Sequence, residues 1–243
     1  MFKRMLASAL IAGTAAGLLA ALLHFVFVQN LILLGETYET GAAVHFAGGA
    51  QHAHSDAVIP AEDHDHAATD HAHGAQSTPL QRNALTVAFT MLIYVSYALI
   101  LVAGFGAASA FGHRIGGVEG LLWGIAGFAV FQLWPAMGLA PELPGTLAAD
   151  LGARQLWWWG TAGATALALA LAGYVRTPSA AAFAALLLAA PHAIGAPELD
   201  GFSGLAPPEL AAAFSARVLG VGLVVWATLG WLAGTVWSRQ DSA

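Results

Sequence analysis

The chain has 243 residues, of which 58% are hydrophobic and only 9% are charged. Soluble domains carry about 25% charged residues, so a chain of this composition exposes much of its surface to lipid. It has no cysteine, which excludes disulfide frameworks and thiolate metal sites. The net charge is -6 and the eight Lys and Arg are scattered singly, so no basic patch is available for nucleic acid. The composition predicts an all-α polytopic membrane protein that sits in a lipid bilayer.

Six segments are apolar enough to cross a bilayer or nearly so, a crossing that takes about 20 residues. They cover residues 5–28, 84–108, 118–137, 156–174, 180–194 and 211–237, and the fifth is the shortest and contains Pro191. The first segment follows Lys3 and Arg4, as the core of a signal peptide would. Its apolar stretch continues to Leu34, however, well beyond a signal core of about 7–15 residues, and no clear cleavage site ends it. We therefore expect about six transmembrane helices, the first of them uncleaved.

Basic residues predict the orientation, because cytoplasmic loops of membrane proteins carry an excess of Lys and Arg. With both termini in the cytoplasm, five basic residues lie inside and three outside, whereas twelve of the fourteen Asp and Glu lie outside. The inner set is Lys3, Arg4, Arg114, Arg176 and Arg239, and the outer set is Arg82, Arg154 and Arg217. We expect the loop between the first two spans to face outward, toward the periplasm or the exterior.

Two outer segments repeat each other. Residues 135–145 resemble residues 191–201, and each segment is followed after a gap by Ala-Arg-x-Leu. The repeat predicts three helical hairpins, of which the last two are duplicates. The expected organisation is a first transmembrane helix (1–34), an outer His/Asp-rich loop (35–83), a second helix with an inner loop (84–117), and hairpin repeats over 118–178 and 179–243.

An arginine stands at the outer start of each returning helix, namely Arg82, Arg154 and Arg217. These side chains either anchor the helices at the membrane interface or hold Glu142 and Glu198 and so shape the outer mouth.

Glycines recur at four-residue spacing, which places them on one helix face and predicts close contact between helices. They are Gly13 and Gly17, then Gly116, Gly120 and Gly124, then Gly230 and Gly234.

Residues 41–79 differ sharply from the rest, with seven histidines inside a 29-residue window and carboxylates between them. The segment shows no apolar periodicity, so we expect a flexible loop. Neutral imidazole and carboxylate are suitable ligands for divalent ions such as Co²⁺, Ni²⁺ and Zn²⁺. The alternative is a solvated polar spacer. The candidate metal ligands are His45, His52, His54, His64, His66, His71, His73, Asp63, Asp65 and Asp70.

Polar groups within or beside the spans form a second candidate site. His24 lies toward the outer end of the first span, and His192 lies toward the outer end of the fifth. Together with Glu36 and Glu39 they are expected to pass a metal ion from the loop to the helices. The alternative for each histidine is a hydrogen bond between helices or a place at the membrane interface. Gln132, in the third span, is ambiguous in the same way.

Several chemistries are excluded by what the sequence lacks. Its only lysine is Lys3, so it has no nucleotide-binding Walker A loop, and neither GxSxG nor HExxH occurs. We expect a protein that is not an enzyme and holds no tightly bound cofactor. A dication that enters a negative-inside cell gains about 4.6 kcal/mol per 100 mV, so uptake along the membrane potential needs no further energy source.

Several blocks of the sequence are similar to the CbtA family of probable cobalt transporter subunits. They are residues 1–4 through His24, the segment from Leu31 to Glu39, the block from Gly138 to Gly145 with residues 150–158, then residues 191–197 and 208–211. The resemblance covers nearly the whole chain in order. It implies an integral inner-membrane protein that supplies cobalt for cobalamin synthesis, beside CbtB, a small single-span partner with its own histidine cluster.

The leading function is therefore uptake of Co²⁺ by a membrane transport subunit, with Ni²⁺ or Zn²⁺ as alternative cargo. A different class is a metal-binding sensor or buffering partner that has no translocation activity of its own. A third class is a membrane scaffold with an incidental histidine tract. Efflux and a homo-oligomeric assembly are also compatible with the sequence.

Overall fold

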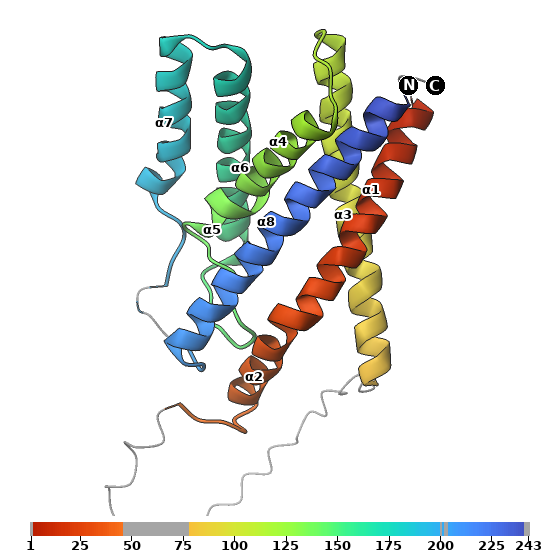
Figure 1. Ribbon diagram of the computed structural model, residues 1–243. Helices are drawn as coiled ribbons and strands as arrows, with labels where there is room; N and C mark the ends of the chain where they lie inside the picture. The colour runs from red at the N-terminus through yellow and green to blue at the C-terminus, as the bar shows by residue number, and fades with distance from the viewer. Residues whose placement is uncertain (1, 46–77, 200, 202–203, 241–243) are drawn as a thin grey trace, which may run out of the picture.

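The computed structural model describes residues 2–45, 78–199, 201 and 204–240, and every regular element in these ranges is a helix (Figure 1). The expectation of an all-α protein is thereby confirmed for the described part of the chain. Most of the candidate metal ligands of the histidine-rich loop lie outside the described residues, namely His52, His54, His64, His66, His71, His73, Asp63, Asp65 and Asp70.

The helices of the described chain form six rods. The elements are α1 (Phe2–Leu23), η1 (His24–Val28), α2 (Gln29–Glu39), α3 (Pro79–Ala110), α4 (Gly117–Phe128), η2 (Ala129–Leu133), α5 (Trp134–Ala136), α6 (Leu151–Tyr174), α7 (Pro178–Ile194) and α8 (Pro208–Arg239). α1, η1 and α2 are one continuous rod, and so are α4, η2 and α5, because η1 and η2 are π-helical segments inside longer helices. The rods thus correspond in order to the six segments expected from the sequence.

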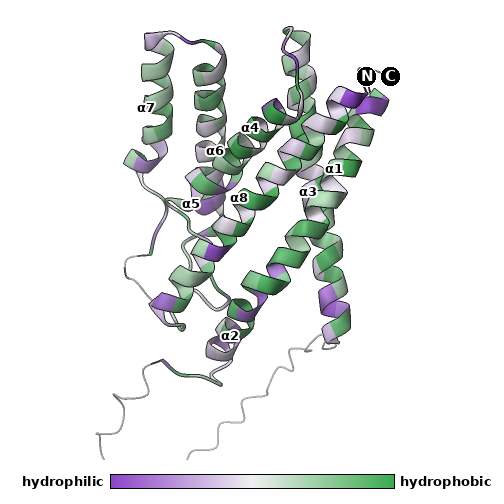
Figure 2. Cartoon of the chain, viewed as in Figure 1, coloured by the Kyte–Doolittle hydropathy of each residue, from purple (hydrophilic) through white to green (hydrophobic). Residues whose placement is uncertain are grey.

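Four of these rods are long and apolar enough to cross a membrane: Phe2–Glu39, Pro79–Ala110, Gly117–Ala136 and Pro208–Arg239. Their outward faces are apolar along most of their length (Figure 2). α7 is apolar but has only 17 residues, fewer than the ~20 that a crossing takes. α6 has 24 residues, yet its tryptophans and threonines lower its hydropathy. The chain is a membrane protein with four candidate spans, and two further spans stay a prediction.

The closest helix contact joins α4 to α8 through glycines. A Cβ atom on Gly120 would lie 2.8 Å from the Gly234 Cα and would overlap the Gly230 carbonyl oxygen. A Cβ on Gly124 would likewise overlap the Trp226 carbonyl oxygen. The two backbones therefore touch along the glycine faces, as small residues at four-residue spacing predict.

A second glycine contact joins α1 to α3, where a Cβ on Gly13 or Gly17 would lie 2.6 Å from a Cα atom of α3. Large side chains of α3 and α8 fill the space between these two helix pairs. Phe105 and Trp237 are almost fully buried there, with ring centroids 6.1 Å apart. The core therefore combines backbone contacts at glycines with aromatic packing around α8.

The helices do not pair as the repeat predicts. α1 packs against α3 as expected, but α4 packs against α8, and α6 packs against α7 (Figure 1). The hairpin arrangement expected from the repeat is therefore not confirmed, although α6 also contacts the third rod through η2 and α5. The physical reason is that the glycine faces of α4 and α8 fit each other more closely than either helix fits its neighbour in sequence.

The boundaries of the outer loop also need a correction, since residues 35–39 and 79–83 are helical. α2 continues to Glu39, and Gly35 within it is buried against Leu143 and Pro144. α3 begins at Pro79, where the Thr78 hydroxyl accepts a hydrogen bond from the Gln81 N–H at 3.3 Å. A capping threonine followed by proline is a strong helix start.

The α4–α8 contact can be tested by adding one methyl group. Gly120→Ala is expected to lower the free energy of unfolding by about 1–3 kcal/mol, because the methyl group forces two backbones apart. Gly220→Ala on α8 is the matched control, since a Cβ there meets nothing within 4 Å. Thermal unfolding of the detergent-solubilised protein measures both variants. Equal midpoints for the two variants would contradict the packing described here.

Candidate functional site

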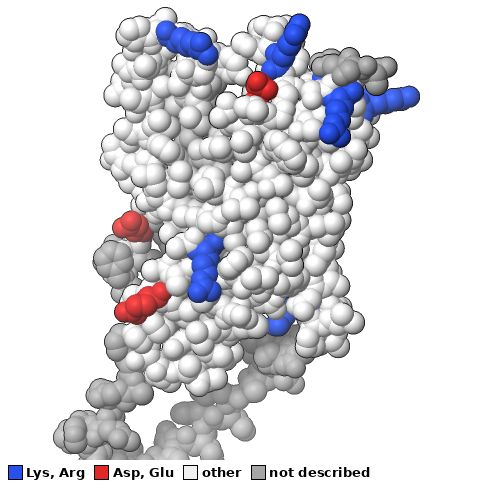
Figure 3. Space-filling model, in the orientation of Figure 1, with Lys and Arg blue, Asp and Glu red and all other residues white. Residues whose placement is uncertain are grey.

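In the view of Figure 3, Lys and Arg gather at one end of the bundle, and most of the visible Asp and Glu lie in its opposite half. The end that holds the first residues of α1 and the last residues of α8, here called the basic end, carries five basic residues and Glu119. The opposite end, here called the carboxylate end, carries most of the acids together with Arg82, Arg154 and Arg217. Its acids are Glu36, Glu39, Glu142, Asp150, Glu198 and Glu209.

A loop that is anchored by one buried side chain, Leu143, closes the carboxylate end. This wedge loop (residues 137–150) connects α5 to α6 and inserts between α2 and α8. Leu143 is only 3% exposed and packs with Val28 and Phe214. The Ser215 hydroxyl of α8 donates a hydrogen bond to the Pro141 carbonyl oxygen at 2.7 Å. The wedge loop is thus fixed to the first and last helices by apolar packing and by a hydrogen bond.

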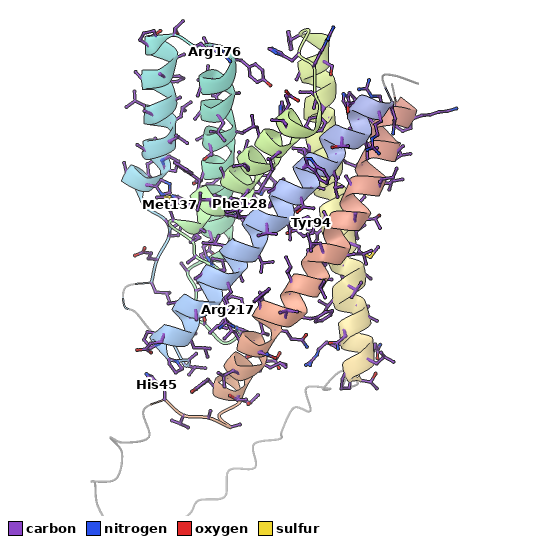
Figure 4. The ribbon with its side chains drawn as sticks, viewed as in Figure 1. His45, Tyr94, Phe128, Met137, Arg176 and Arg217 are labelled. Carbon is purple, nitrogen blue, oxygen red and sulfur yellow. The ribbon has the colours of Figure 1, made fainter. Side chains whose placement is uncertain are left out.

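Glu39 lies against the wedge loop. Gly145 has φ 76°, a left-handed conformation that favours glycine, and a Cβ on it would meet Glu39 Cβ at 3.0 Å. Glu36 precedes Glu39 by three residues, so both carboxylates project from the same face of α2. After α2 the described chain continues to His45, which is exposed at the carboxylate end (Figure 4).

One of the two arginine clamps expected from the sequence is present. Arg154 Nη2 lies 2.7 Å from Glu142 Oε2, and Asp150 caps α6 by accepting from the Ala153 N–H at 2.9 Å. The prediction that Arg217 holds Glu198 is wrong, because the Arg217 side chain donates a hydrogen bond to the Phe27 carbonyl oxygen of η1 at 3.2 Å. α8 packs against η1 rather than α7, which places Arg217 (Figure 4) beside the first rod.

Two π-helical segments, η1 and η2, both pack against α8. π-helical segments are frequent at functional sites, because the inserted residue widens the helix and redirects side chains. His24, half-buried, begins η1. Gln132 lies in η2, and its Oε1 atom is buried at Gly222 of α8 with no hydrogen-bond partner. A cavity of 130 Å³ between α6, α8 and the wedge loop adjoins Gln132.

The four residues expected to form one site are spread over the structure. His24 and Glu36 are twelve residues apart on one rod, which corresponds to about 18 Å at 1.5 Å per residue. His192 lies on α7, which packs against α6 and not against the first rod. Among the described residues, no three His, Asp or Glu side chains lie close enough together to hold one metal ion. A role in metal binding stays a prediction for each of these residues, and they would act at separate positions and not as one ligand cluster.

Two tryptophan side chains bind the backbone of α7 near His192. The Trp157 indole N–H donates to the Pro191 carbonyl oxygen at 3.0 Å, and the Trp134 indole N–H donates to the Leu188 carbonyl oxygen at 3.2 Å. The His192 ring meets the Trp157 ring edge-on at 5.8 Å, and its Nε2 atom is buried without a partner. The sequence did not show that these tryptophans fix α7, although Trp157 lies in one of the blocks that carry the family resemblance.

An all-helical chain with four candidate spans and with charge sorted to its two ends is a polytopic membrane protein. The sequence profile of the CbtA family, described as a probable cobalt transporter subunit, matches residues 2–238. The chain therefore belongs to the CbtA family, which confirms the resemblance seen in the sequence and supports a transport role. No curated protein and no solved structure matches the chain.

The wedge loop gives a second prediction. Leu143→Ala is expected to lower the free energy of unfolding by about 2–5 kcal/mol, because it leaves a cavity between α2 and α8. Leu147→Ala in the same loop is the control, since Leu147 is 65% exposed and its truncation should change stability by less than about 0.5 kcal/mol. Thermal unfolding in detergent separates the two. An unchanged unfolding midpoint for Leu143→Ala would show that the loop does not hold these helices together.

Proposed function

We propose that this chain is the membrane-embedded subunit of an importer for divalent transition-metal ions, with Co²⁺ for cobalamin synthesis as the favoured cargo. The family supports transport of cobalt by a subunit. The observation that carries the proposal concerns the described helices that flank the histidine-rich segment. α2 ends at Glu39 and α3 begins at Pro79, and both of these helix ends lie at the carboxylate end (Figure 1).

The proposed orientation places the carboxylate end in the periplasm of a bacterial inner membrane and both termini in the cytoplasm. The basic end carries Lys3, Arg4, Arg114, Arg176 and Arg239. An excess of Lys and Arg marks the cytoplasmic side of membrane proteins. Cations outside the cell then meet carboxylates and imidazoles first.

Capture by the histidine-rich segment is the first step of the proposed mechanism. Imidazole nitrogen and carboxylate oxygen suit borderline divalent ions, and the binding weakens in mild acid because imidazole must be neutral to act as a ligand. Glu36 and Glu39 attract the released ion to the mouth beside the wedge loop. His24 and Gln132, in π-helical segments against α8, are the next polar groups on the way inward.

The membrane potential supplies the energy in this proposal. A dication gains about 4.6 kcal/mol per 100 mV on moving to the negative side. This sustains a concentration ratio of roughly 10³, since each 1.4 kcal/mol is a factor of ten. The proposed partner is a CbtB-like single-span subunit with its own histidines, and a homo-oligomer of this chain is compatible with the same mechanism.

The proposal is tested by uptake of radiolabelled Co²⁺ into proteoliposomes that contain this chain with and without a CbtB-like partner. Glu36→Gln with Glu39→Gln is expected to lower initial uptake at low cobalt about tenfold, which corresponds to ~1.4 kcal/mol of lost attraction. Removal of residues 46–77 should raise the cobalt concentration that gives half-maximal uptake. Competition with Ni²⁺ and Zn²⁺ ranks the cargo.

Glu119→Gln is the matched control, because Glu119 lies at the basic end and glutamine keeps its capping hydrogen bond to the Gly116 N–H. The same loss of uptake in this control would contradict a special role for the carboxylate end. No uptake above background in any partner combination would overturn the proposal. Metal bound to vesicles whose lumen stays empty would instead indicate a sensor or buffering protein.

A further inference from the structure

A cavity opens at the basic end of the described chain, and its walls extend inward to Val130 and Phe131 of η2. It has a volume of 580 Å³, within the range of about 300–1,000 Å³ of small-molecule sites, and is lined by residues of α3, α4, α6 and α8. Its walls are mainly apolar, with Ile100, Leu122, Val130 and Leu169 among them. The cavity exists because α6 contacts the third rod through η2 and α5, so that α6 and α7 stand apart from α4 at the basic end (Figure 1).

Two arginines lie at the mouth of this cavity. Arg114 comes from the loop between α3 and α4, and Arg176 from the loop between α6 and α7 (Figure 4). The two loops meet where the His113 and Tyr174 rings approach to 4.9 Å. In the described part of the chain, neither arginine has an ion pair or a hydrogen bond from its side chain, in contrast to Arg154.

The electrostatics of the mouth favour an anion. The single carboxylate that lines the cavity, Glu119, accepts a hydrogen bond from the Gly116 N–H at 2.9 Å at the start of its own helix. α4 and α7 begin close to the arginines, and the start of a helix carries partial positive charge. Such a mouth repels a divalent cation, so the cavity is poorly suited to metal passage.

The backbone of Arg176 supports a specific role for its side chain. Its φ is 26°, the one positive φ of a non-glycine residue in the described chain. A residue held in such a conformation costs of order 1–3 kcal/mol and is frequent at binding sites. Glycine would relieve this cost, yet an arginine occupies the position and lines the cavity mouth.

We propose that this cavity binds an anionic phospholipid. The phosphate lies between the Arg114 and Arg176 guanidinium groups, which match phosphate geometry with paired N–H donors. One acyl chain lies along the apolar wall between α4 and α6. Basic pockets between transmembrane helices on the cytoplasmic side bind anionic headgroups in this way. The inference depends on the membrane class of the protein and on its proposed orientation, but not on metal transport.

Native mass spectrometry of the full chain with equimolar phosphatidylglycerol and phosphatidylethanolamine tests the headgroup. The wild type should retain phosphatidylglycerol at least about tenfold over phosphatidylethanolamine, and Arg114→Gln with Arg176→Gln should abolish the preference. Arg239→Gln is the matched control, because it removes a positive charge from the same end but does not line the cavity. Equal retention of the two lipids by the wild type, or equal loss in the control, would overturn the proposal.

Filling the cavity tests the acyl chain. Gly173 lines the cavity, and a Cβ on it meets nothing within 4 Å, so Gly173→Leu should fill the space and lower retention of lipid several-fold. Gly163→Leu on the same helix is the control, since Gly163 also faces open space but lies outside the cavity. Ala170→Leu, also at the cavity wall, replaces Gly173→Leu if that variant does not fold. Unchanged retention in the cavity variant, or displacement of the lipid by inorganic phosphate alone, would contradict a lipid site.

Discussion

Backbone contact between α4 and α8, which glycine alone permits, decides where the other helices of this protein lie. Gly120, Gly124 and Gly230 allow these two helices to touch, and α8 lies at the centre of the bundle, with its own Trp226 and Trp237 almost fully buried. α1 and α3 pack on the other sides of α8. α7 therefore cannot lie beside α8 and packs with α6 instead. In lipid, where apolar side chains gain little from contact with one another, such close packing of small residues is a main source of helix association.

Two features follow from this arrangement. At the carboxylate end, the wedge loop connects α5 to α6 and packs Leu143 between α2 and α8. In the same loop, Gly145 lies beside Glu39. At the basic end, the separation of α6 from α4 leaves a cavity with Arg114 and Arg176 at its mouth. The two ends differ in the sign of their charge and so suit different ligands. This difference is the basis of the two proposals, a path for metal cations at the carboxylate end and a site for an anionic headgroup at the basic end.

The sequence predicts what depends on local composition. Apolar length places the six helices, and glycine spacing identifies the close-packed faces. The Arg154–Glu142 pair corresponds to one of the two alternatives that the sequence leaves open for the outer arginines. The partner of each glycine face is set by contacts between distant segments, and the repeat misleads because α8 takes α4 instead of α7. Gln132 is a second example. The sequence shows a polar residue in an apolar span, but its burial against Gly222 depends on the packing of distant helices. Metal binding by the histidine-rich residues 46–77 stays a prediction, because these residues lie outside the described chain.

The central claim is tested most directly by determining which side of the membrane the carboxylate end faces. The chain has no cysteine, so single thiols can be introduced at Thr40, beside the carboxylate end, and at Phe111, which is 84% exposed at the basic end. Labelling of intact cells with a membrane-impermeant maleimide should modify the Thr40→Cys protein at once and the Phe111→Cys protein only after permeabilisation. The opposite pattern would place the metal-capturing groups in the cytoplasm and contradict the account of import.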